Sequence, residues 1–161
     1  ISEEEHAGML NENSEEPYCE ELAKAITTEI RKGNRIDTTT KLRNVIEKTL
    51  DFLPNNKEKK DIIKKTCQRT FQALRIDVNN EFEVLYEFME KLPEALKPGG
   101  RVAILTFHSG EDKLVKKALK AGYKEGIYSE YARDVVRPSA QECAQNGRAR
   151  STKMRWAVKA E

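Results

Sequence analysis

The chain has 161 residues, of which 38% are apolar and 35% are charged, and its formal net charge is +2. This length fits one domain of average size or two small ones, and the near-neutral charge by itself points to no class of partner. No apolar stretch approaches the roughly 20 residues of a membrane span, and the acidic start does not resemble a signal peptide, so we expect no membrane association.

The charge is distributed unevenly. Residues 1–21 hold eight acids and no lysine or arginine, whereas residues 133–159 hold seven bases and two acids. The three cysteines, Cys19, Cys67 and Cys143, lie far apart and include no CxxC pair. We therefore expect neither a disulfide framework nor a metal site, and a reducing compartment fits this cysteine usage.

The first predicted elements are helices. Residues 1–12 are acidic and lack a hydrophobic pattern, so we expect them to be frayed. Asn13 and Ser14 are favourable N-cap residues, Pro17 suits a first turn, and Gly33 suits a helix end. Between these signals, apolar residues recur at helical spacing: Tyr18, Leu22, Ile26 and Ile30.

A second helix should begin at Asp37 or Thr38 and end at Pro54. It would pair with the first as an antiparallel hairpin, making residues 13–54 a small helical unit. From Ile62 to Leu92 the helical spacing continues, which predicts one long helix or two, ended by the KPGG stretch at 97–100.

The C-terminal part mixes strands and helices. Residues 102–107 form a continuous apolar run, which predicts a strand buried on both faces, as in a parallel sheet covered by helices. A helix over about 110–121, weak alternation within 123–137, a short helix after the turn at 137–142, and a strand over 153–160 follow. Strand 102–107 has only one or two neighbours within the chain, so either the partner strands of a helix-rich α/β fold are missing or the sheet is a small α+β one.

The FHSGED stretch (107–112) lies just beyond a predicted strand, where α/β proteins commonly bind ligands. His108 could act as a general base or hydrogen-bond donor. Ser109 could cap the next helix, with Asp112 as the third residue of a capping box. The alternative interpretation is a buried turn histidine beside a plain N-cap. No G-x-S-x-G elbow is present, which argues against a serine hydrolase.

Two stretches present basic side chains. In QRTFQALRIDVNNE (68–81), one helix face carries Arg69, Gln72, Arg75 and Asn79, and it could contact phosphates or bases or be merely solvated. In NGRARSTKMR (146–155), basic side chains surround small residues: Arg148, Arg150, Lys153 and Arg155. They could hold a phosphate backbone. They could instead brace the last strand through internal ion pairs, for example between Arg150 and Asp112 or Glu111.

These stretches, with GGRVAILTFHSGEDKLVKKA between them, resemble in sequence and order the MraW/RsmH family of S-adenosylmethionine-dependent RNA methyltransferases. The family pattern is close to RTFQALRI-x-VN-x-E, GGR-x-x-VISFHSLEDR-x-VK and P-S-x-x-E-x-x-N-x-RARSAKLR. SEEPYCEELAKAI and IDTTTKLRNVI also look like family segments. The resemblance covers roughly residues 13–157.

The resemblance implies a fold and an activity. Residues 1–61 would be a helical domain on the substrate side, inserted into a Rossmann-like methyltransferase domain, and residues 62–161 would be the C-terminal part of that methyltransferase domain. The glycine-rich cofactor turn lies N-terminal to these segments in the family, so we expect no cofactor-binding residue in this chain and no activity from it alone. The full-length parent would use S-adenosylmethionine to methylate the exocyclic N4 of a cytidine in small-subunit ribosomal RNA.

The resemblance also suggests residue roles. His108 and Ser109 are the candidates for the catalytic site, where they would line the pocket for the target base. The candidates for RNA contacts are Arg69, Arg75, Asn79, Arg148, Arg150 and Lys153. Small-subunit ribosomal RNA is the expected partner, with a homodimer left open. The expected location is the cytoplasm, or an organelle if the source is eukaryotic.

Departures from the family pattern leave alternatives open. The His-Pro-Ala before RTFQALRI is here Lys65-Thr66-Cys67, which should remove a helix break. Gly110 stands where leucine is usual, and Gly147 and Thr152 also differ. The chain could instead be a non-catalytic RNA-binding or adaptor piece related to the family, or an unrelated α+β protein.

Overall fold

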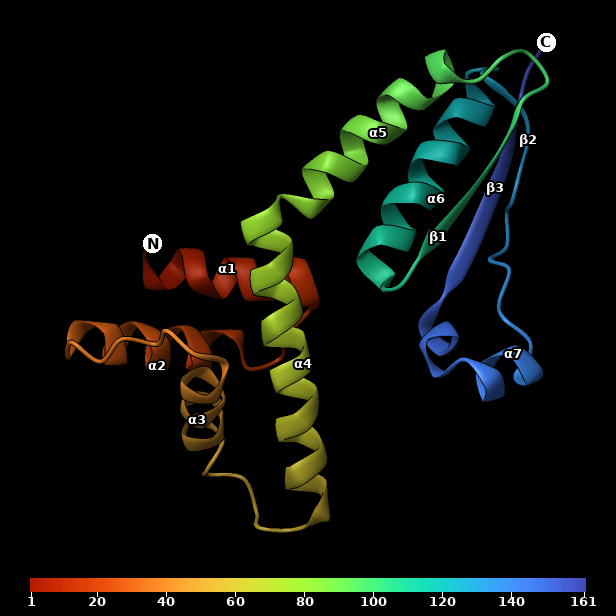
Figure 1. Cartoon of the computed structure of the whole chain (residues 1–161). Coiled ribbons are helices and arrows are strands. Elements are labelled where there is room, and N and C mark those ends of the chain that lie inside the picture. Colours follow the sequence, from red (N-terminus) through yellow and green to blue (C-terminus); the bar gives the residue numbers. More distant parts are fainter. The chain divides into compact units, whose positions relative to one another are not determined.

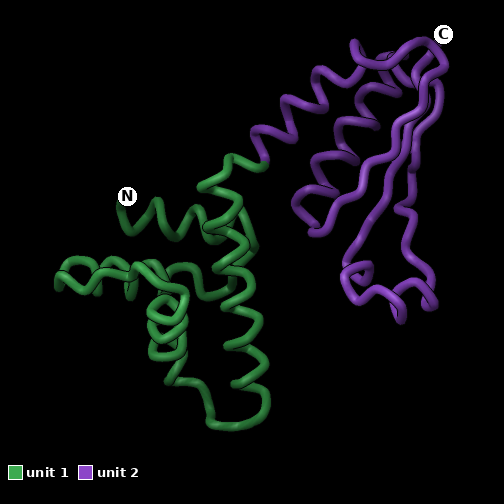
Figure 2. Tube along the Cα trace, in the orientation of Figure 1, with its two compact units in different colours: residues 1–81 green, residues 82–161 purple.

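The computed structural model describes all 161 residues, which form two compact units, residues 1–81 and residues 82–161 (Figure 2). The elements, labelled in Figure 1, are α1 (Glu3–Ser14), α2 (Cys19–Arg31), α3 (Thr39–Thr49), α4 (Lys57–Asn79), α5 (Glu81–Ala95), β1 (Arg101–Thr106), α6 (Ser109–Lys124), β2 (Tyr128–Tyr131), α7 (Ala140–Gln145), the 3₁₀ helix η1 (Gly147–Ser151) and β3 (Lys153–Lys159). This is the expected helix-rich α/β composition. None of the helices has the length and apolar character needed to cross a membrane. The units divide after residue 81, because α4 packs along its length in the first unit.

Helix α1 corrects the expectation that residues 1–12 are frayed. Ser2 and Glu5 form a reciprocal capping box, in which the Glu5 N–H donates to Ser2 Oγ (3.1 Å) and the Ser2 N–H donates to the Glu5 carboxylate (2.6 Å). Leu10 is fully buried, and Asn13 donates from its side-chain amide to the Ala73 carbonyl of α4 at 3.1 Å. A single buried leucine gives no detectable periodicity, which explains why the helix was missed.

Helices α2 and α3 begin at different signals. The predicted start of α2 at residues 13–14 was wrong because Asn13 and Ser14 form the last turn of α1. The predicted cap of α3 at Thr38 is confirmed, since its hydroxyl accepts the Lys41 N–H at 3.2 Å. Figure 1 shows α3 crossing α2 instead of running antiparallel to it as predicted. The core that unites them with α1 and α4 comprises Leu10, Leu22, Ile26, Leu42, Ile46, Leu50 and Ala73.

Between α1 and α2, one carboxylate is buried. The Glu16 side chain is 0% exposed and lies 2.7 Å from Arg69 Nε of α4. Its oxygens also accept the Thr66 hydroxyl at 3.3 Å and the Tyr18 N–H at 3.1 Å. The charge is therefore compensated on several sides, as a buried charge requires.

The long helical stretch resolves into two helices. Helix α4 runs without a break through Thr66, where the family pattern has a proline, so the expected loss of the break is confirmed. It ends at Asn80, whose φ of 50° is left-handed and therefore stops the helix. Helix α5 begins at once with Glu81 and carries Pro93 in its last turn.

The second unit holds a three-stranded antiparallel sheet with the order β1-β3-β2. One face of the sheet packs on α5 and α6, and the shared core is formed by Met89, Leu92, Val115, Leu119, Tyr128 and Ala157. Along β1, Val102 and Ile104 pack toward this core, whereas Leu105, on the other face, is 56% exposed. The prediction that the strand is buried on both faces was wrong. β1 lies at a sheet edge, and helices cover only one of its faces.

A second buried ion pair joins β3 to α6. Arg155 Nε lies 2.7 Å from Asp112 Oδ1, and Nη2 lies 3.2 Å from Oδ2, which makes a bidentate contact. Arg155 also donates to the Ala132 and Arg133 carbonyls, so it ties the segment after β2 to the same point. The hydrogen bond from Arg155 holds the pKa of the Asp112 carboxyl below its usual range.

Replacing Arg69 by methionine should destabilise the first unit, because it leaves the Glu16 carboxylate buried without its cation. We expect the free energy of unfolding to fall by about 3 kcal/mol. Arg43→Met, which removes only an exposed i,i+4 partner of Glu47, should change it by less than about 0.5 kcal/mol. Urea unfolding followed by circular dichroism measures both, and equal effects would contradict the buried-charge explanation.

The Asp112–Arg155 pair should make stability depend on pH. Because the folded-state pKa of Asp112 is lowered, its stabilisation is present at neutral pH and is lost as pH falls below the carboxyl's ordinary value of 3.8. Asp112→Asn should therefore be less stable than the parent by about 1–3 kcal/mol at pH 7, with the difference shrinking toward pH 3. Denaturant unfolding at several pH values tests this, with Glu130→Gln on the exposed strand β2 as control. A difference that stays constant with pH would refute it.

Candidate functional site

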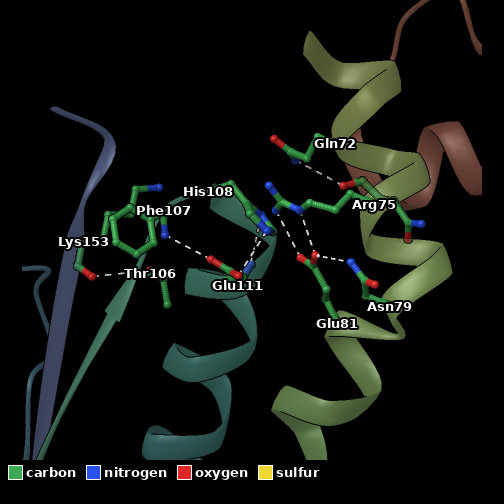
Figure 3. Close-up of polar contacts among 10 residues, drawn as sticks. Gln72, Arg75, Asn79, Glu81, Thr106, Phe107, His108, Glu111 and Lys153 are labelled. Carbon is green, nitrogen blue, oxygen red and sulfur yellow. Dashed lines mark hydrogen bonds and ion pairs between the residues drawn. The ribbon is translucent and has the colours of Figure 1, made fainter. Parts of the chain in front are cut away.

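The turn after β1 is built around His108, which is the N-cap of α6. Its backbone is extended, and its ring Nδ1 accepts the Glu111 N–H at 3.4 Å. The Glu111 carboxylate in turn accepts the Phe107 N–H at 3.0 Å (Figure 3). The predicted cap by Ser109 and Asp112 was wrong by one residue, since the imidazole serves as cap acceptor and Asp112 is held by Arg155.

His108 is held in place on two sides within the second unit. Its side chain is 11% exposed, and Nε2 lies 3.4 Å from Glu111 Oε1. The Phe82 ring meets the imidazole edge to face, with centroids 5.8 Å apart. Ser109, by contrast, is exposed at the first position of α6. The turn therefore offers a fixed imidazole and a free hydroxyl at the carboxyl end of β1.

Steric packing explains why position 110 is a glycine in this chain. A Cβ atom at this position would lie 2.7 Å from Cζ and 3.1 Å from Cε1 of the Phe82 ring. Phe82 therefore fills the space into which a side chain at 110 would project. The Phe82 ring thus occupies the space beside the glycine that replaces the family's leucine, and the turn stays packed.

The polar face of α4 is occupied by internal partners. Arg69 pairs with the buried Glu16, and Gln72 reaches the Asn13 carbonyl at 3.5 Å. Arg75 makes two contacts with Glu81, from Nε at 2.8 Å and from Nη2 at 3.1 Å (Figure 3). Asn79 also donates to Glu81 at 3.5 Å. Of the RNA candidates in this helix, Arg75 keeps an exposed side chain (57%), whereas that of Arg69 is 30% exposed.

The C-terminal candidates lie in η1 and β3. Arg148 and Arg150 are exposed, and neither forms an ion pair. Lys153 is half-buried at the start of β3, where its carbonyl accepts the Thr106 hydroxyl at 3.4 Å (Figure 3). The alternative in which Arg150 pairs with Asp112 is not seen, because Asp112 binds Arg155. The bracing function in this segment belongs to Arg155 alone, which leaves the arginines of η1 available for a ligand.

The three cysteines form no disulfide. Burial raises the pKa of the Cys67 thiol, which keeps it protonated and unreactive at neutral pH. It packs beside the first unit's core as a small apolar side chain.

Sequence reasoning missed a groove between α2 and α3 of about 810 Å³. Its floor includes the half-buried Ala25, Ile36 and Val45, and its rim includes exposed lysines. A signal was present in the composition, because residues 22–50 hold seven bases and three acids. Those bases are spread over two helices and their connection, so no short run drew attention to them.

Comparison with known proteins places these features in a family. The model of the "MraW methylase family" matches residues 1–160. "Ribosomal RNA small subunit methyltransferase H 1" of Agathobacter rectalis is 86% identical over the whole chain, which covers 46% of that relative. The protein of the same name from Lachnoclostridium phytofermentans is 69% identical over 99% of the chain and 43% of the relative. "Ribosomal RNA small subunit methyltransferase H 2" of Acholeplasma laidlawii is 49% identical, again over 99% of the chain and 46% of the relative. The chain thus spans a little under half the length of these relatives, and it belongs to the MraW methylase family.

Proposed function

We propose that this chain is part of an enzyme that methylates small-subunit ribosomal RNA. The observation that carries the proposal is the match of residues 1–160 to the methylase family, together with the relatives named as ribosomal RNA small subunit methyltransferases. Because the chain covers 46% of the first of these relatives, the activity is proposed for the whole protein and not for the chain alone.

We further propose, from the resemblance, that the methyl donor is S-adenosylmethionine and the acceptor is the exocyclic N4 of a cytidine. That nitrogen is a weak nucleophile because its lone pair is delocalised into the ring. The enzyme must take the base out of its stack and hold N4 with acceptors that localise the lone pair as the new bond forms. His108 and Ser109 are proposed to line the base pocket, since both lie at the carboxyl end of β1.

The residues of this chain do not fit the cofactor. The turn after β1 contains one glycine, Gly110, and the Phe82 ring fills the space beside it. The N–H groups of Phe107 and Glu111 are already bound within the turn, so they are not available as a phosphate or carboxylate cradle. No chemical step is therefore assigned here to the cofactor. We propose that its binding residues lie in the part of the enzyme that this chain does not cover.

The sheet of the second unit supports the proposal that the rest of the enzyme packs against this chain. The outer edge of β1 has no neighbouring strand, and the face away from α6 carries the apolar side chains of Leu105 and Trp156. An unpaired strand edge beside an uncovered apolar face is a surface that proteins normally cover. Further strands and helices from the remaining half of the enzyme would cover it, and they would give β1 the two-sided burial that its apolar sequence predicts.

A non-catalytic RNA-binding or adaptor protein is the second candidate. The exposed arginines at 148 and 150, which form no ion pair, are compatible with it. The two candidates differ in whether the full-length protein transfers methyl groups, so one experiment separates them.

The full-length protein that contains this chain should transfer a labelled methyl group from S-adenosylmethionine to small-subunit RNA, and nucleoside analysis should find N4-methylated cytidine. The 161-residue chain alone should show no heat of binding in calorimetric titration with the cofactor. Absence of transfer by the full-length protein would favour the adaptor. Micromolar binding by the chain alone would show that its residues do form a cofactor site.

In the same full-length protein, Arg148→Gln with Arg150→Gln should weaken RNA binding through lost phosphate contacts. Each lost contact should flatten the slope of log affinity against log salt by roughly 0.7 to 0.9. Arg155→Gln is the comparison, since it removes one such charge from a buried ion pair. It should lower the melting temperature and leave the salt slope unchanged. If the η1 variant instead lowers stability with the slope intact, its arginines brace the fold and do not bind RNA.

A further inference from the structure

The groove between α2 and α3 differs from the candidate sites in its chemistry. Its floor is apolar, and its rim includes Lys24 from α2, Arg35 from the connecting segment and Lys48 from α3. All three side chains are exposed and form no ion pair. The groove lies wholly within the first unit, in the part of Figure 1 where α2 and α3 cross.

Glu21 of α2 also lines the groove, exposed and without an ion pair, whereas the remaining charges are already committed. Lys41 is paired with Asp37 at 2.6 Å. Glu29 accepts a hydrogen bond from the Asn34 amide at 2.8 Å and lies 3.7 Å from Lys32. Its pKa is lowered, chiefly by the bond from Asn34 and further by Lys32 and Lys48, so it stays ionised and internally compensated. Three cations without an ion pair therefore face one unpaired carboxylate, Glu21, and the rim keeps a net positive charge for a ligand even though Lys48 also acts on Glu29.

An occupant must match cations spaced on opposite walls above an apolar floor. A strand of RNA has this character, because its phosphates repeat along the backbone while its bases and riboses present less polar surfaces. The floor residues Ala25 and Val45 can contact a base or ribose, and the exposed Asn44 amide can both donate and accept at a base edge.

We propose that the α2–α3 groove binds a single-stranded segment of the RNA substrate, with Lys24, Arg35 and Lys48 on its phosphates. The inference rests on the proposed function for its partner. It adds a second RNA contact surface in the helical unit, formed by residues to which neither the family resemblance nor the sequence motifs gave a role.

The test measures binding of the full-length protein to a fluorescent single-stranded RNA oligonucleotide over a series of salt concentrations. Lys24→Gln with Lys48→Gln should lower affinity and flatten the salt slope by about 1.4, since each contact to a single strand accounts for roughly 0.7. The matched control is Lys60→Gln with Lys64→Gln. These two lysines are exposed, unpaired and in the same unit, on α4, so the control loses equal charge away from the groove.

Each of the following outcomes overturns the proposal. Equal losses in both double variants would mean that only net charge matters. An unchanged slope in the groove variant, or no RNA binding by the parent protein, would mean that RNA does not use the groove. Poly-glutamate is titrated in parallel as an acidic peptide. If the groove variant loses poly-glutamate binding but keeps RNA binding, the occupant is an acidic peptide. Methyl transfer is measured separately, so a groove variant with normal RNA binding in an active methyltransferase sinks this inference and leaves the proposed function standing.

Discussion

The first unit depends on finding partners for one buried carboxylate. Glu16 lies between α1 and α2 with no exposed side-chain surface, and its charge is compensated by Arg69, the cation of α4, with hydrogen bonds from the Thr66 hydroxyl and the Tyr18 N–H. An unpaired charge in that position would be very unfavourable, so α4 must lie where Arg69 reaches Glu16. The requirement fixes α4 against the α1–α2 junction, and the apolar core then closes around that arrangement. It also explains why α4 belongs to the helical unit along its whole length.

The second unit is likewise held together by a buried ion pair, which lies between β3 and α6. The bidentate Arg155–Asp112 pair links the last strand to α6, and the carbonyls of Ala132 and Arg133 bind the same guanidinium. β3 is the central strand, so one residue connects the middle of the sheet, the helix that covers it, and the segment after β2. The turn carrying His108 and Ser109 starts that same helix, and its position is therefore tied to the sheet.

Two departures from the family pattern are accompanied by compensating contacts. Thr66 stands where the pattern has proline, and its hydroxyl donates to the buried Glu16 carboxylate while α4 runs on unbroken. Gly110 replaces leucine, and the Phe82 ring fills the space next to its backbone. In each case the structure keeps the local packing and changes only which residue supplies it. These differences therefore do not argue against family membership.

Local signals in the sequence predicted α3 from its Thr38 cap, the short helix that follows the turn at 137–142 and the strand at 153–160. These features depend on neighbouring residues, whose propensities and spacing can be read directly. Motif order was equally informative, and it identified the family before any geometry was known. Local signals did not predict α1, because its single buried leucine gives no pattern. They also did not show that His108, and not Ser109, is the N-cap of α6.

Tertiary structure decided which polar residues are committed and which are available. Arg69, Arg148, Arg150 and Arg155 look alike as sequence, yet two are locked to buried or half-buried carboxylates and two are exposed without a partner. The carboxylates that make this difference, Glu16 and Asp112, lie 53 and 43 residues away from their arginines. The α2–α3 groove likewise exists only once two helices and their connection come together. Sequence by itself determined the family and most of the elements, because those depend on local order. The roles of individual charges depend on contacts between distant segments, and only the folded chain brings those segments together.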